Sequence, residues 1–508
     1  MMNYQYVTDL NSLPENQPVK VDVAGTSLIL IRSLGQVRAF QSKCPHAGGP
    51  LEKGAICDGK LVCPWHKAAF DITNGEWREP LALTNLKQYP VLIEQNRVLV
   101  NPRPSSPASR PNIRGDRPQT AVILGTGAAG SAAAITLRDA GFSGHLILID
   151  KDDGAPYDRT ALSKFVPAGK MKISEVPHLL DDAFYSQPGV ECLREEVTAL
   201  DCHAHQITLA TGRSVHYDKL LLATGGQPVW PEIPGNHQAG VHVLRDIHQA
   251  QRLLNEVEQE QQLVVIGNSF IAMELAAALR NQDIDVTVLS RHALPFVPQF
   301  GEEIGRRFRE LHKQNGVKFM TGEPVALEGN GHVQGVKLKN GHTLPAHVVV
   351  FATGVRPATE LAHDLPHEQD GSLSVDETLS AAPDVWAVGD IASYPAPEGR
   401  RRIEHWRVAQ QQGHIAALNM LGEHHAFDRV PFFWTTHFGT RFEYLGYARE
   451  WDSIKMLGSF DDKRFAVLYG EAGVLKAVLS CGEYSATAGL LLKMQQPVSI
   501  NVASEILA

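Results

Sequence analysis

The sequence contains few cysteines and no long hydrophobic run. Six cysteines are scattered over 508 residues, and this is too sparse for the disulfide framework of a small secreted protein. No stretch of about 18 or more apolar residues occurs, so a membrane-spanning helix is not expected. The first residues have neither a basic segment nor an apolar core, and no signal peptide is expected. We therefore expect a cytoplasmic protein that has no membrane partner.

Positive charge is also scarce. The 47 lysines and arginines are outnumbered by 56 aspartates and glutamates, and the formal net charge is −9. Nucleic acids bind proteins through basic surfaces, so we expect no nucleic-acid partner. The length favours roughly three or four domains, because one hydrophobic core rarely organises so long a chain.

The texture of the sequence changes along the chain. Residues 1–103 contain short apolar runs broken by Gly, Asn and Pro, a pattern typical of antiparallel strands. Residues 104–118 are rich in proline and have no apolar period, as expected of an extended linker. The strands predicted in the first segment are Lys20–Val23, Ser27–Ile31, Gln36–Phe40, Leu61–Cys63, Tyr89–Glu94 and Arg97–Val100.

From residue 119 the sequence predicts α/β structure. A buried strand, a glycine turn, an alanine-rich helix and a second strand follow one another up to Asp150, and the pattern recurs from Gln261 to Ser290. Repeated βαβ units of this kind predict Rossmann-like dinucleotide-binding domains. We expect one such domain in two parts, a second one between these parts, and a C-terminal α+β domain. The expected bounds are 119–240 and 353–427 for the first, 241–352 for the second and 428–508 for the last.

Two cysteines and two histidines near the N-terminus have the spacing of metal ligands. Cys44 and His46 belong to one loop and Cys63 and His66 to another, which gives C-x-H-x16-C-x-x-H. Four such ligands could hold a tetrahedral zinc ion. Zinc modules usually pair like ligands, however, whereas each loop here supplies one Cys and one His. Mixed loops suit a [2Fe–2S] cluster in which one iron binds two thiolates and the other binds two imidazoles.

The surrounding sequence, CPHAGGPLEKGAICDGKLVCPWHKAAFDITNGE, closely resembles Rieske-type ferredoxin domains. The resemblance implies an all-β domain in which the four residues named above hold the cluster. Lys67 departs from the pattern, because glycine follows the second histidine in many members. The cysteine pair that bridges the two loops in cytochrome bc complexes is also missing from the sequence.

A glycine-rich turn opens the helix of the first βαβ unit. Its glycines allow a tight turn, close approach of the backbone to a pyrophosphate, and close packing of the helix on the strand. Asp150 ends the second strand, where a carboxylate would bind a ribose hydroxyl. The residues of the turn that we assign to a dinucleotide are Gly125, Gly127, Ala128, Ala129 and Gly130.

The segments YDRTALSK (157–164), LLATGG (221–226) and VWAVGD (385–390) resemble the FAD-dependent reductases that serve ferredoxins, putidaredoxins and rubredoxins. The resemblance implies a glutathione-reductase-like fold and FAD as the cofactor. It also places Arg159 and Lys164 beside the flavin, where a positive group stabilises reduced flavin. No C-x-x-C or C-x4-C occurs, which excludes the dithiol chemistry of glutathione and thioredoxin reductases. The other residues assigned to FAD are Ala223, Thr224, Gly225, Gly389 and Asp390.

The second βαβ unit carries a weaker fingerprint, which we interpret as the site for NADH or NADPH. Gly267 is retained, whereas Ser269 and Ala272 replace two of the usual glycines. Glu274 aligns with a family glutamate that faces the nicotinamide. Gly354 matches the turn that closes this domain in the family.

The choice between the two nicotinamide cofactors depends on the end of the second strand. Ser290 stands where NAD-specific proteins usually carry an acid for the ribose. The next residue, Arg291, could pair with the 2′-phosphate of NADPH. We expect weak discrimination that is tilted toward NADPH.

The order of Rieske domain, linker and reductase resembles the Rieske-containing branch of the apoptosis-inducing-factor-like oxidoreductases over nearly the whole chain. In that branch Glu404, His405 and Trp406 lie next to the isoalloxazine. Trp434 resembles an aromatic of the C-terminal domain near the nicotinamide side. The catalytic residues implied are Lys164, Glu274 and Trp406.

Together these motifs predict a multidomain NAD(P)H-dependent reductase that passes electrons through FAD to its own Rieske cluster. From the cluster they would reach an oxygenase, a cytochrome or a small electron carrier. The linker would let the cluster domain dock at the flavin edge and swing toward such a partner. The chain is expected to be a monomer or a homodimer.

Two other functions stay open at this point. A redox-sensing or death-signalling adaptor would need a targeting segment or a basic DNA-binding face, and the sequence shows neither. A reductase whose cluster receives electrons and reduces NAD(P)⁺ would carry the same motifs, and only the potentials of cluster and flavin separate that direction.

Overall fold

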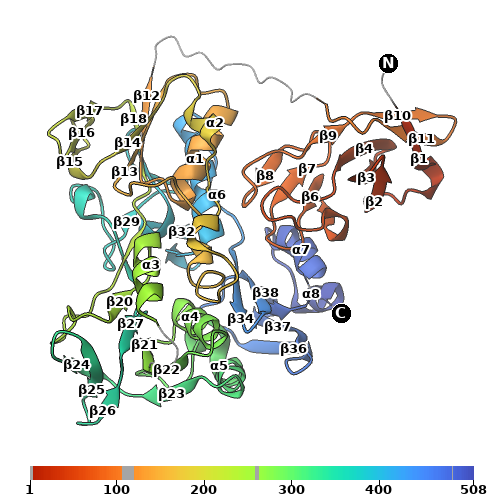
Figure 1. Cartoon of the computed structure of the whole chain (residues 1–508). Helices are drawn as coiled ribbons and strands as arrows, with labels where there is room; N and C mark the ends of the chain where they lie inside the picture. Colours follow the sequence, from red (N-terminus) through yellow and green to blue (C-terminus); the bar gives the residue numbers. More distant parts are fainter. Residues whose placement is uncertain (1–3, 106–118, 258–261, 483, 508) are drawn as a thin grey trace.

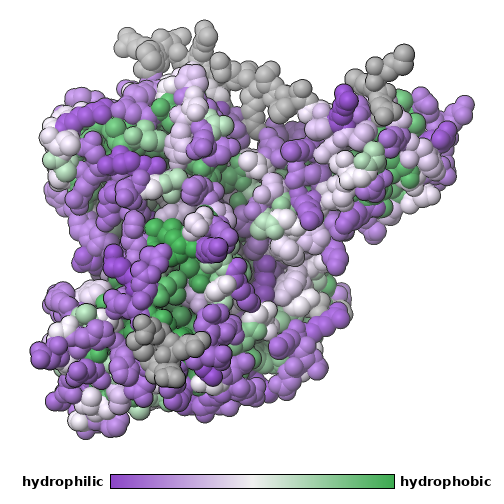
Figure 2. Space-filling view, in the orientation of Figure 1, coloured by the Kyte–Doolittle hydropathy of each residue, from purple (hydrophilic) through white to green (hydrophobic). Residues whose placement is uncertain are grey.

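The structure is a computed structural model that describes residues 4–105, 119–257, 262–482 and 484–507. Most of the expected linker, residues 106–118, therefore lies outside the described residues. The N-terminal domain sits beside α7 (Tyr484–Lys493) and α8 (Ile500–Leu507), to one side of the two α/β domains (Figure 1). In Figure 2 hydrophilic residues dominate the surface, and hydrophobic ones gather near α3 (Ile247–Glu256) and α4 (Phe270–Arg280).

The N-terminal domain is all-β, as predicted. Its strands form three antiparallel sheets, in the orders β2-β3-β4-β9, β5-β6-β7-β8 and β1-β11-β10. Apolar side chains gather in two clusters, one around Phe40 and Phe70 and one around Leu28. The strands are β1 (Gln5–Asp9), β2 (Pro18–Val23), β3 (Thr26–Ser33), β4 (Gln36–Gln41), β5 (Ala55–Cys57), β6 (Lys60–Val62), β7 (Ala69–Asp71), β8 (Trp77–Glu79), β9 (Gln88–Tyr89), β10 (Val91–Glu94) and β11 (Arg97–Val100).

One predicted strand of this domain is divided in the structure. The sequence predicted a single strand over Tyr89–Glu94, whereas β9 ends at Tyr89 and β10 begins at Val91. Pro90 separates them, because it has no N–H to donate to a neighbouring strand. As a result β9 pairs with β4, and β10 pairs with β11 in another sheet.

The first α/β domain is built on a six-stranded sheet in the order β14-β13-β12-β18-β31-β30. Its central strands are buried on both faces, as expected for parallel strands covered by helices. Helices α1 and α6 pack together, and a Cβ added to Gly413 of α6 would lie 2.1 Å from the Ala129 carbonyl oxygen of α1. The elements are β12 (Thr120–Leu124), α1 (Ala128–Asp139), β13 (His145–Asp150), α2 (Asp182–Tyr185), β14 (Val190–Arg194), β18 (Lys219–Leu222), β30 (Ser380–Ala382), β31 (Val385–Ala387) and α6 (Trp406–Met420).

Small sheets flank this domain and connect it to the next. They are β15 (Val197–Asp201), β16 (Gln206–Leu209) and β17 (Ser214–His216), then β19 (Gly226–Pro228) with β28 (Val355–Pro357), and β29 (Leu373–Ser374), β32 (Ala392–Ala396) and β33 (Gly399–Arg401). The β19–β28 pair is antiparallel and joins the two segments at which the chain leaves the first domain and returns to it.

The second α/β domain has a five-stranded parallel sheet in the order β20-β27-β21-β22-β23. Helix α4 is hydrophobic and buried along most of its length, with Leu275 and Leu279 in the core. The elements are β20 (Val241–Val243), α3 (Ile247–Glu256), β21 (Gln262–Ile266), α4 (Phe270–Arg280), β22 (Asp285–Ser290), α5 (Val297–Gln314), β23 (Lys318–Thr321), β24 (Pro324–Gly329), β25 (Val333–Leu338), β26 (Thr343–Pro345) and β27 (Val348–Phe351).

The C-terminal domain is α+β, as the return of short strands predicted. An antiparallel sheet in the order β34-β35-β38-β37-β36 is followed by α7 and α8. Its first strand brings Trp434, Thr435 and His437 to the boundary between the other domains. The strands are β34 (Phe432–His437), β35 (Thr440–Gly446), β36 (Ser453–Ser459), β37 (Arg464–Glu471) and β38 (Val474–Cys481).

Candidate functional site

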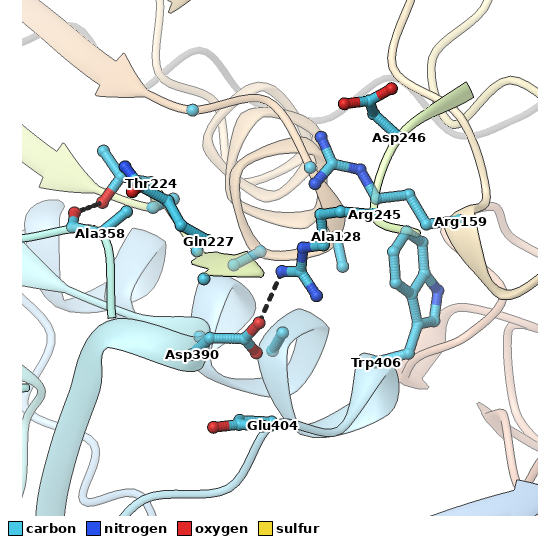
Figure 3. Close-up of a pocket in the computed structure, with 18 of the residues that line it drawn as sticks. Ala128, Arg159, Thr224, Gln227, Arg245, Asp246, Ala358, Asp390, Glu404 and Trp406 are labelled. Atoms are coloured by element: carbon cyan, nitrogen blue, oxygen red, sulfur yellow. Dashed lines mark hydrogen bonds and ion pairs between the residues drawn. The ribbon is translucent and has the colours of Figure 1, made fainter. Parts of the chain in front are cut away.

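A large cavity opens where the loops after β12, β18 and β31 meet. Its volume is about 720 Å³, and residues of the first α/β domain, of α4 and of β34 line it. The carboxyl ends of parallel strands and the start of a helix are where α/β folds bind dinucleotides. Figure 3 shows Thr224, Asp390, Trp406 and Arg159 around this space.

Most of the residues assigned to FAD from the sequence line this cavity. The one residue of that set outside the cavity lining is Gly130, which packs beneath the turn. The lining residues of the list are Gly125, Gly127, Ala128, Ala129, Asp150, Arg159, Lys164, Ala223, Thr224, Gly225, Gly389, Asp390, Glu404, His405 and Trp406.

The three glycines of the turn have different surroundings. Gly125 has φ +95°, and a Cβ there would lie 2.3 Å from the Ala223 carbonyl oxygen. A Cβ on Gly130 would lie 1.9 Å from the carbonyl oxygen of Gly125. Beside Gly127, by contrast, no described atom lies within 4 Å of the added Cβ. The first and third glycines are therefore required by packing, and the second leaves room for a pyrophosphate at the N-terminus of α1.

Asp150 holds the turn in place as well as lining the cavity. Its Oδ2 accepts hydrogen bonds from the backbone N and the Oγ1 of Thr126, at 2.7 and 2.6 Å. Its Oδ1 accepts from the backbone N of Asp152 at 3.1 Å. A carboxylate in this position, at the end of β13, suits a ribose hydroxyl.

A buried ion pair lies at the boundary of the first and second α/β domains. Lys164 Nζ is 3.1 Å from Glu274 Oε2, and the two side chains are 8% and 4% exposed. Ser163 Oγ donates to the same oxygen at 2.6 Å, and Thr435 Oγ1 donates to Glu274 Oε1 at 2.7 Å. These contacts hold the Glu274 carboxylate beside the cavity.

Arg245 is a site residue that the sequence analysis missed. Its Nη2 is 2.7 Å from Asp390 Oδ2, and Figure 3 marks this contact between two residues that line the cavity. No motif surrounds Arg245, and its proximity to Asp390 arises only from folding. Gln227 and Phe433 line the same cavity and were not predicted either.

Burial controls protonation on the α6 side of the cavity. Desolvation lowers the pKa of His405 to about 4, although the charge of Asp390 opposes the shift. Desolvation also raises the pKa of Glu404, against the opposing effect of Arg402. The neutral His405 ring packs on Phe433, with ring centroids 4.4 Å apart.

The residues predicted to bind the nicotinamide cofactor do not all reach this cavity. Glu274 does, whereas the others lie at the carboxyl ends of β21, β22 and β27. A Cβ on Gly267 would lie 2.3 Å from the Ala352 carbonyl oxygen, as a tight turn requires. Ser269 caps α4, and its Oγ also donates to that same carbonyl at 3.1 Å. The predicted residues outside the cavity are Gly267, Ser269, Ser290, Arg291 and Gly354.

At the end of β22 the predicted phosphate contact already has a partner. Arg291 Nη2 lies 3.3 Å from Glu323 Oε1, and both side chains are exposed. Ser290 Oγ donates to the His292 carbonyl oxygen at 2.6 Å. Neighbouring Arg291 and Lys339 lower the pKa of Glu323, with Lys339 the larger influence.

The four predicted iron ligands form two pairs in the N-terminal domain. The Nδ1 atoms of His46 and His66 face one another at 3.0 Å, and burial lowers the pKa of both rings. Cys44 and Cys63 are buried and hydrogen-bonded to each other, and this bond raises the pKa of Cys44 and helps to lower that of Cys63 to about 7. Neutral imidazoles as one pair and two adjacent buried thiols as the other fit the ligand set of a Rieske cluster.

Close packing shapes the loops around these ligands. A Cβ on Gly49 would lie 2.9 Å from Cys63 Sγ and 3.3 Å from the Trp65 ring. Cys44 N donates to the Gly49 carbonyl at 2.9 Å, and Cys63 N donates to the Ala68 carbonyl at 2.8 Å. Backbone hydrogen bonds within each loop therefore help to hold the four ligands in position.

Trp434 connects the two sites. Its ring centroid is 4.4 Å from that of His66, and the same side chain lines the dinucleotide cavity. Lys164 Nζ lies 6.0 Å from the centre of the Trp434 ring. The sequence placed this aromatic near the nicotinamide, and the structure adds a contact with an iron-ligand ring that no local pattern indicated.

Comparison with known proteins identifies both parts of the chain. Residues 119–413 match the pyridine nucleotide-disulphide oxidoreductase family and residues 3–90 match the Rieske [2Fe-2S] domain. The chain belongs to the pyridine nucleotide-disulphide oxidoreductases. Within them it is an NAD(P)H-dependent flavoprotein of the ferredoxin-reductase type, which carries FAD and a Rieske [2Fe–2S] cluster and passes electrons through the flavin toward that cluster. The zinc alternative is thereby set aside.

Several relatives share this organisation in whole or in part. Apoptosis-inducing factor 3 of Mus musculus is 31% identical over 496 residues, which cover 93% of this chain and 81% of the relative. The biphenyl dioxygenase system ferredoxin–NAD(+) reductase component of Paraburkholderia xenovorans (strain LB400) is 35% identical over 331 residues, or 64% of this chain and 81% of that protein.

A solved structure supports the arrangement of the reductase part. The covalent putidaredoxin reductase–putidaredoxin complex is similar with a TM-score of 0.71 and 26% identity, over 76% of this chain and 95% of the solved chain. None of the helices in the described part of this chain has both the length and the apolar character that crossing a bilayer requires.

Proposed function

We propose that electrons leave the flavin site for the Rieske cluster by way of Trp434, within one chain. The observation that carries the proposal is the position of this indole, which lines the cavity on one side and packs on His66 on the other. When bound, FAD would accept two electrons from NAD(P)H and release them singly to the one-electron cluster.

In this account Lys164 and Glu274 prepare the reacting edge of the flavin site. Glu274 accepts hydrogen bonds from Ser163 and Thr435 and pairs with Lys164. The carboxylate is thus held in one orientation, suited to the carboxamide of the nicotinamide. The ammonium of Lys164 faces the cavity, where it would stabilise negative charge on a reduced ligand.

Other predicted residues would bind the cofactors without taking part in the chemistry. The turn at Gly127 and the N-terminus of α1 would hold the pyrophosphate, and Asp150 a ribose. Gly267, Ser269 and Gly354 would hold the NAD(P)H pyrophosphate, at the matching ends of β21 and β27. The domain division proposed from the sequence, at residues 103, 118, 240, 352 and 427, fits this assignment of roles.

We further propose that the final acceptor is a protein that takes one electron at a time. The relative from Paraburkholderia is named for a dioxygenase system, and the solved complex contains putidaredoxin. Trp65, beside the cluster loop, is 38% exposed and would face such a partner. None of the six cysteines forms a disulfide within the described residues, which supports the proposal of a cytoplasmic site of action.

Substitution of Trp434 tests the electron path. Trp434→Leu should slow the reduction of the cluster by the reduced flavin by tenfold or more, as followed by stopped-flow absorbance after NAD(P)H has reduced the flavin. Trp434→Phe, which retains an aromatic ring, should slow it less. Equal cluster reduction in the wild type and the Leu variant would contradict a path through this side chain.

A further inference from the structure

The Rieske domain shares a hydrophobic core with the C-terminal domain. Val62 and Ala69, from β6 and β7, are fully buried in the same cluster as Phe432, Leu445 and Ala488 of the C-terminal domain. Ala55 and Cys57 of β5 pack against this cluster, and α7 lies along the Rieske strands in Figure 1. Separating the domains would expose this apolar surface to water.

Lys67 occupies the centre of the contact. It follows the iron ligand His66, has φ +60° and is fully buried. Its Nζ lies 2.8 Å from Glu443 Oε2 and donates to the Tyr484 carbonyl at 3.1 Å and to the Pro64 carbonyl at 2.5 Å. The left-handed backbone conformation at this position favours glycine, so a lysine here carries a conformational cost.

Glu443, the partner of Lys67, also contacts the cluster loop through Arg441. Glu443 is fully buried, accepts a hydrogen bond from Thr487 at 2.9 Å and pairs with Arg441 at 2.8 Å. Arg441 in turn donates to the Trp65 carbonyl, and its Nη1 lies 3.3 Å from His66 Nε2. The C-terminal domain therefore holds the ligand loop on both sides of His66.

Another buried cluster fixes the other edge of the Rieske domain to α6. Arg407 is 1% exposed, and its Nη2 lies 3.4 Å from Glu79 and donates to the Lys67 carbonyl at 3.2 Å. Glu79 also pairs with Arg429 at 2.7 Å and accepts from Gln411 at 2.6 Å. The contacts at both ends of the domain involve the same lysine.

We propose that the Rieske domain of this protein is permanently docked, and that Lys67 is the positioning residue that aligns the cluster loop with Trp434. Transfer from flavin to cluster then takes place without domain motion. The apolar cluster supplies the stability of the contact, and the buried ion pairs set its register, since such pairs add specificity more than affinity. The proposal rests on the proposed function, in which the cluster receives its electrons from the flavin.

A disulfide across the contact tests the docking directly. A Cβ on Gly489 of α7 would lie 3.7 Å from Ala55 Cβ in β5, which is within the range that a disulfide spans. We expect Ala55→Cys/Gly489→Cys, in a Cys57→Ser background, to form the bridge and to reduce both the cluster and cytochrome c at the wild-type rate. Loss of either activity on oxidation, with recovery in dithiothreitol, would show that the domain must move and would overturn the proposal. Each single-cysteine variant is the control for the thiols themselves.

Viscosity separates a fixed domain from a mobile one. In the wild type the rate of flavin-to-cluster transfer should not change with added glycerol. Lys67→Gly keeps the left-handed conformation and removes the ion pair with Glu443. Transfer from flavin to cluster should then become at least tenfold slower and sensitive to viscosity. Flavin reduction by NAD(P)H and the Rieske paramagnetic resonance spectrum should not change. Lys53→Ala, at an exposed lysine of the same domain, is the matched control.

Opposite results have distinct meanings. A wild-type rate in Lys67→Gly, or a viscosity-dependent rate in the wild type, overturns the proposal. If the Lys67 variant does not fold, Glu443→Gln replaces it as the test. This variant changes the partner of Lys67 in the C-terminal domain and should also slow the transfer from flavin to cluster. If NAD(P)H never reduces the cluster although dithionite does, the proposed function fails. Docking is then judged by whether the disulfide forms fully without changing the Rieske spectrum.

Discussion

Lys164 and Glu274 form a buried ion pair, 3.1 Å from Nζ to Oε2, at the edge of the dinucleotide cavity. The two residues come from different domains and lie 110 positions apart in the sequence. Their opposite charges lie beside the same cavity. Changing either one alone therefore alters the potential of the cavity in a direction that can be stated in advance.

The first prediction concerns the flavin midpoint potential. Glu274→Gln leaves the positive charge of Lys164 uncompensated, which favours reduced flavin and should raise the potential by about 30 mV, equivalent to about 1.4 kcal/mol for a two-electron couple. Lys164→Gln should lower it by a similar amount. Spectroelectrochemical titration measures both. Shifts of the same sign in the two variants would contradict the assignment, and Lys318→Gln, in the exposed pair with Asp285, is the control.

The second prediction separates two glycines of the same turn. Gly127 has an ordinary φ of −63° and open space beside it, so Gly127→Ala should fold normally and bind FAD more weakly. Gly130→Ala would place a methyl group 1.9 Å from the Gly125 carbonyl oxygen and should reduce the yield of folded protein. Flavin content and circular dichroism of the purified variants distinguish the effects. Gly154→Ala, at an exposed glycine with no close neighbour, should change neither quantity.

The third prediction concerns the choice of nicotinamide cofactor. Glu323 pairs with Arg291, the residue expected to meet a 2′-phosphate. Glu323→Gln should free the guanidinium and raise kcat/KM for NADPH relative to NADH by about twofold to fivefold, a size typical of an exposed ion pair. Arg291→Ala should lower the same ratio. A ratio that stays constant in both variants would mean that the adenosine phosphate lies elsewhere.

The fourth prediction concerns pH and stability. Burial lowers the pKa of His312 from 6.5 to about 4, although the carbonyls of Phe308 and Met273 oppose the shift. Near pH 6.5 the unfolded chain takes up a proton at His312, whereas the folded chain does not. The contribution of the neutral, buried His312 to the free energy of unfolding is therefore complete above pH 6.5 and is lost as the pH falls toward 4. The loss should reach about 2 kcal/mol at pH 5, at about 1.4 kcal/mol per pH unit.

Thermal melting from pH 7 to 5 tests this contribution. The fall in Tm should be smaller in His312→Gln than in the wild type, because glutamine does not titrate. His363→Gln, at a histidine that is 72% exposed, should follow the wild-type profile. An identical pH slope in all three proteins would show that His312 does not contribute.

Local patterns predicted the parts of the site that depend on spacing. The four iron ligands lie on adjacent loops, and a glycine turn at a strand end can be recognised in a single segment, as at Gly125 and Gly127. Glu274 and Lys164 could be named only through a family resemblance. The strand over Tyr89–Glu94 was wrong in one detail, since the apolar run hides the break at Pro90.

The relationships between domains could not be predicted in this way. Lys67 and Glu443 are 376 positions apart, and only folding of both domains brings them into contact. From the sequence Lys67 was a departure from the usual glycine, with no indication of a partner. The swinging cluster domain stays a prediction that rests on a proline-rich linker, and the sequence of a linker carries no information about the buried surfaces that its two ends bring together.

The most direct test of the account is anaerobic addition of NADH or NADPH to the wild-type protein, with the flavin followed by absorbance and the cluster by electron paramagnetic resonance. The account predicts bleaching of the flavin and then the signal of the reduced Rieske cluster, in a phase whose rate does not depend on protein concentration. Full bleaching of the flavin with no Rieske signal, in protein whose cluster dithionite does reduce, would contradict electron transfer from the flavin to the cluster.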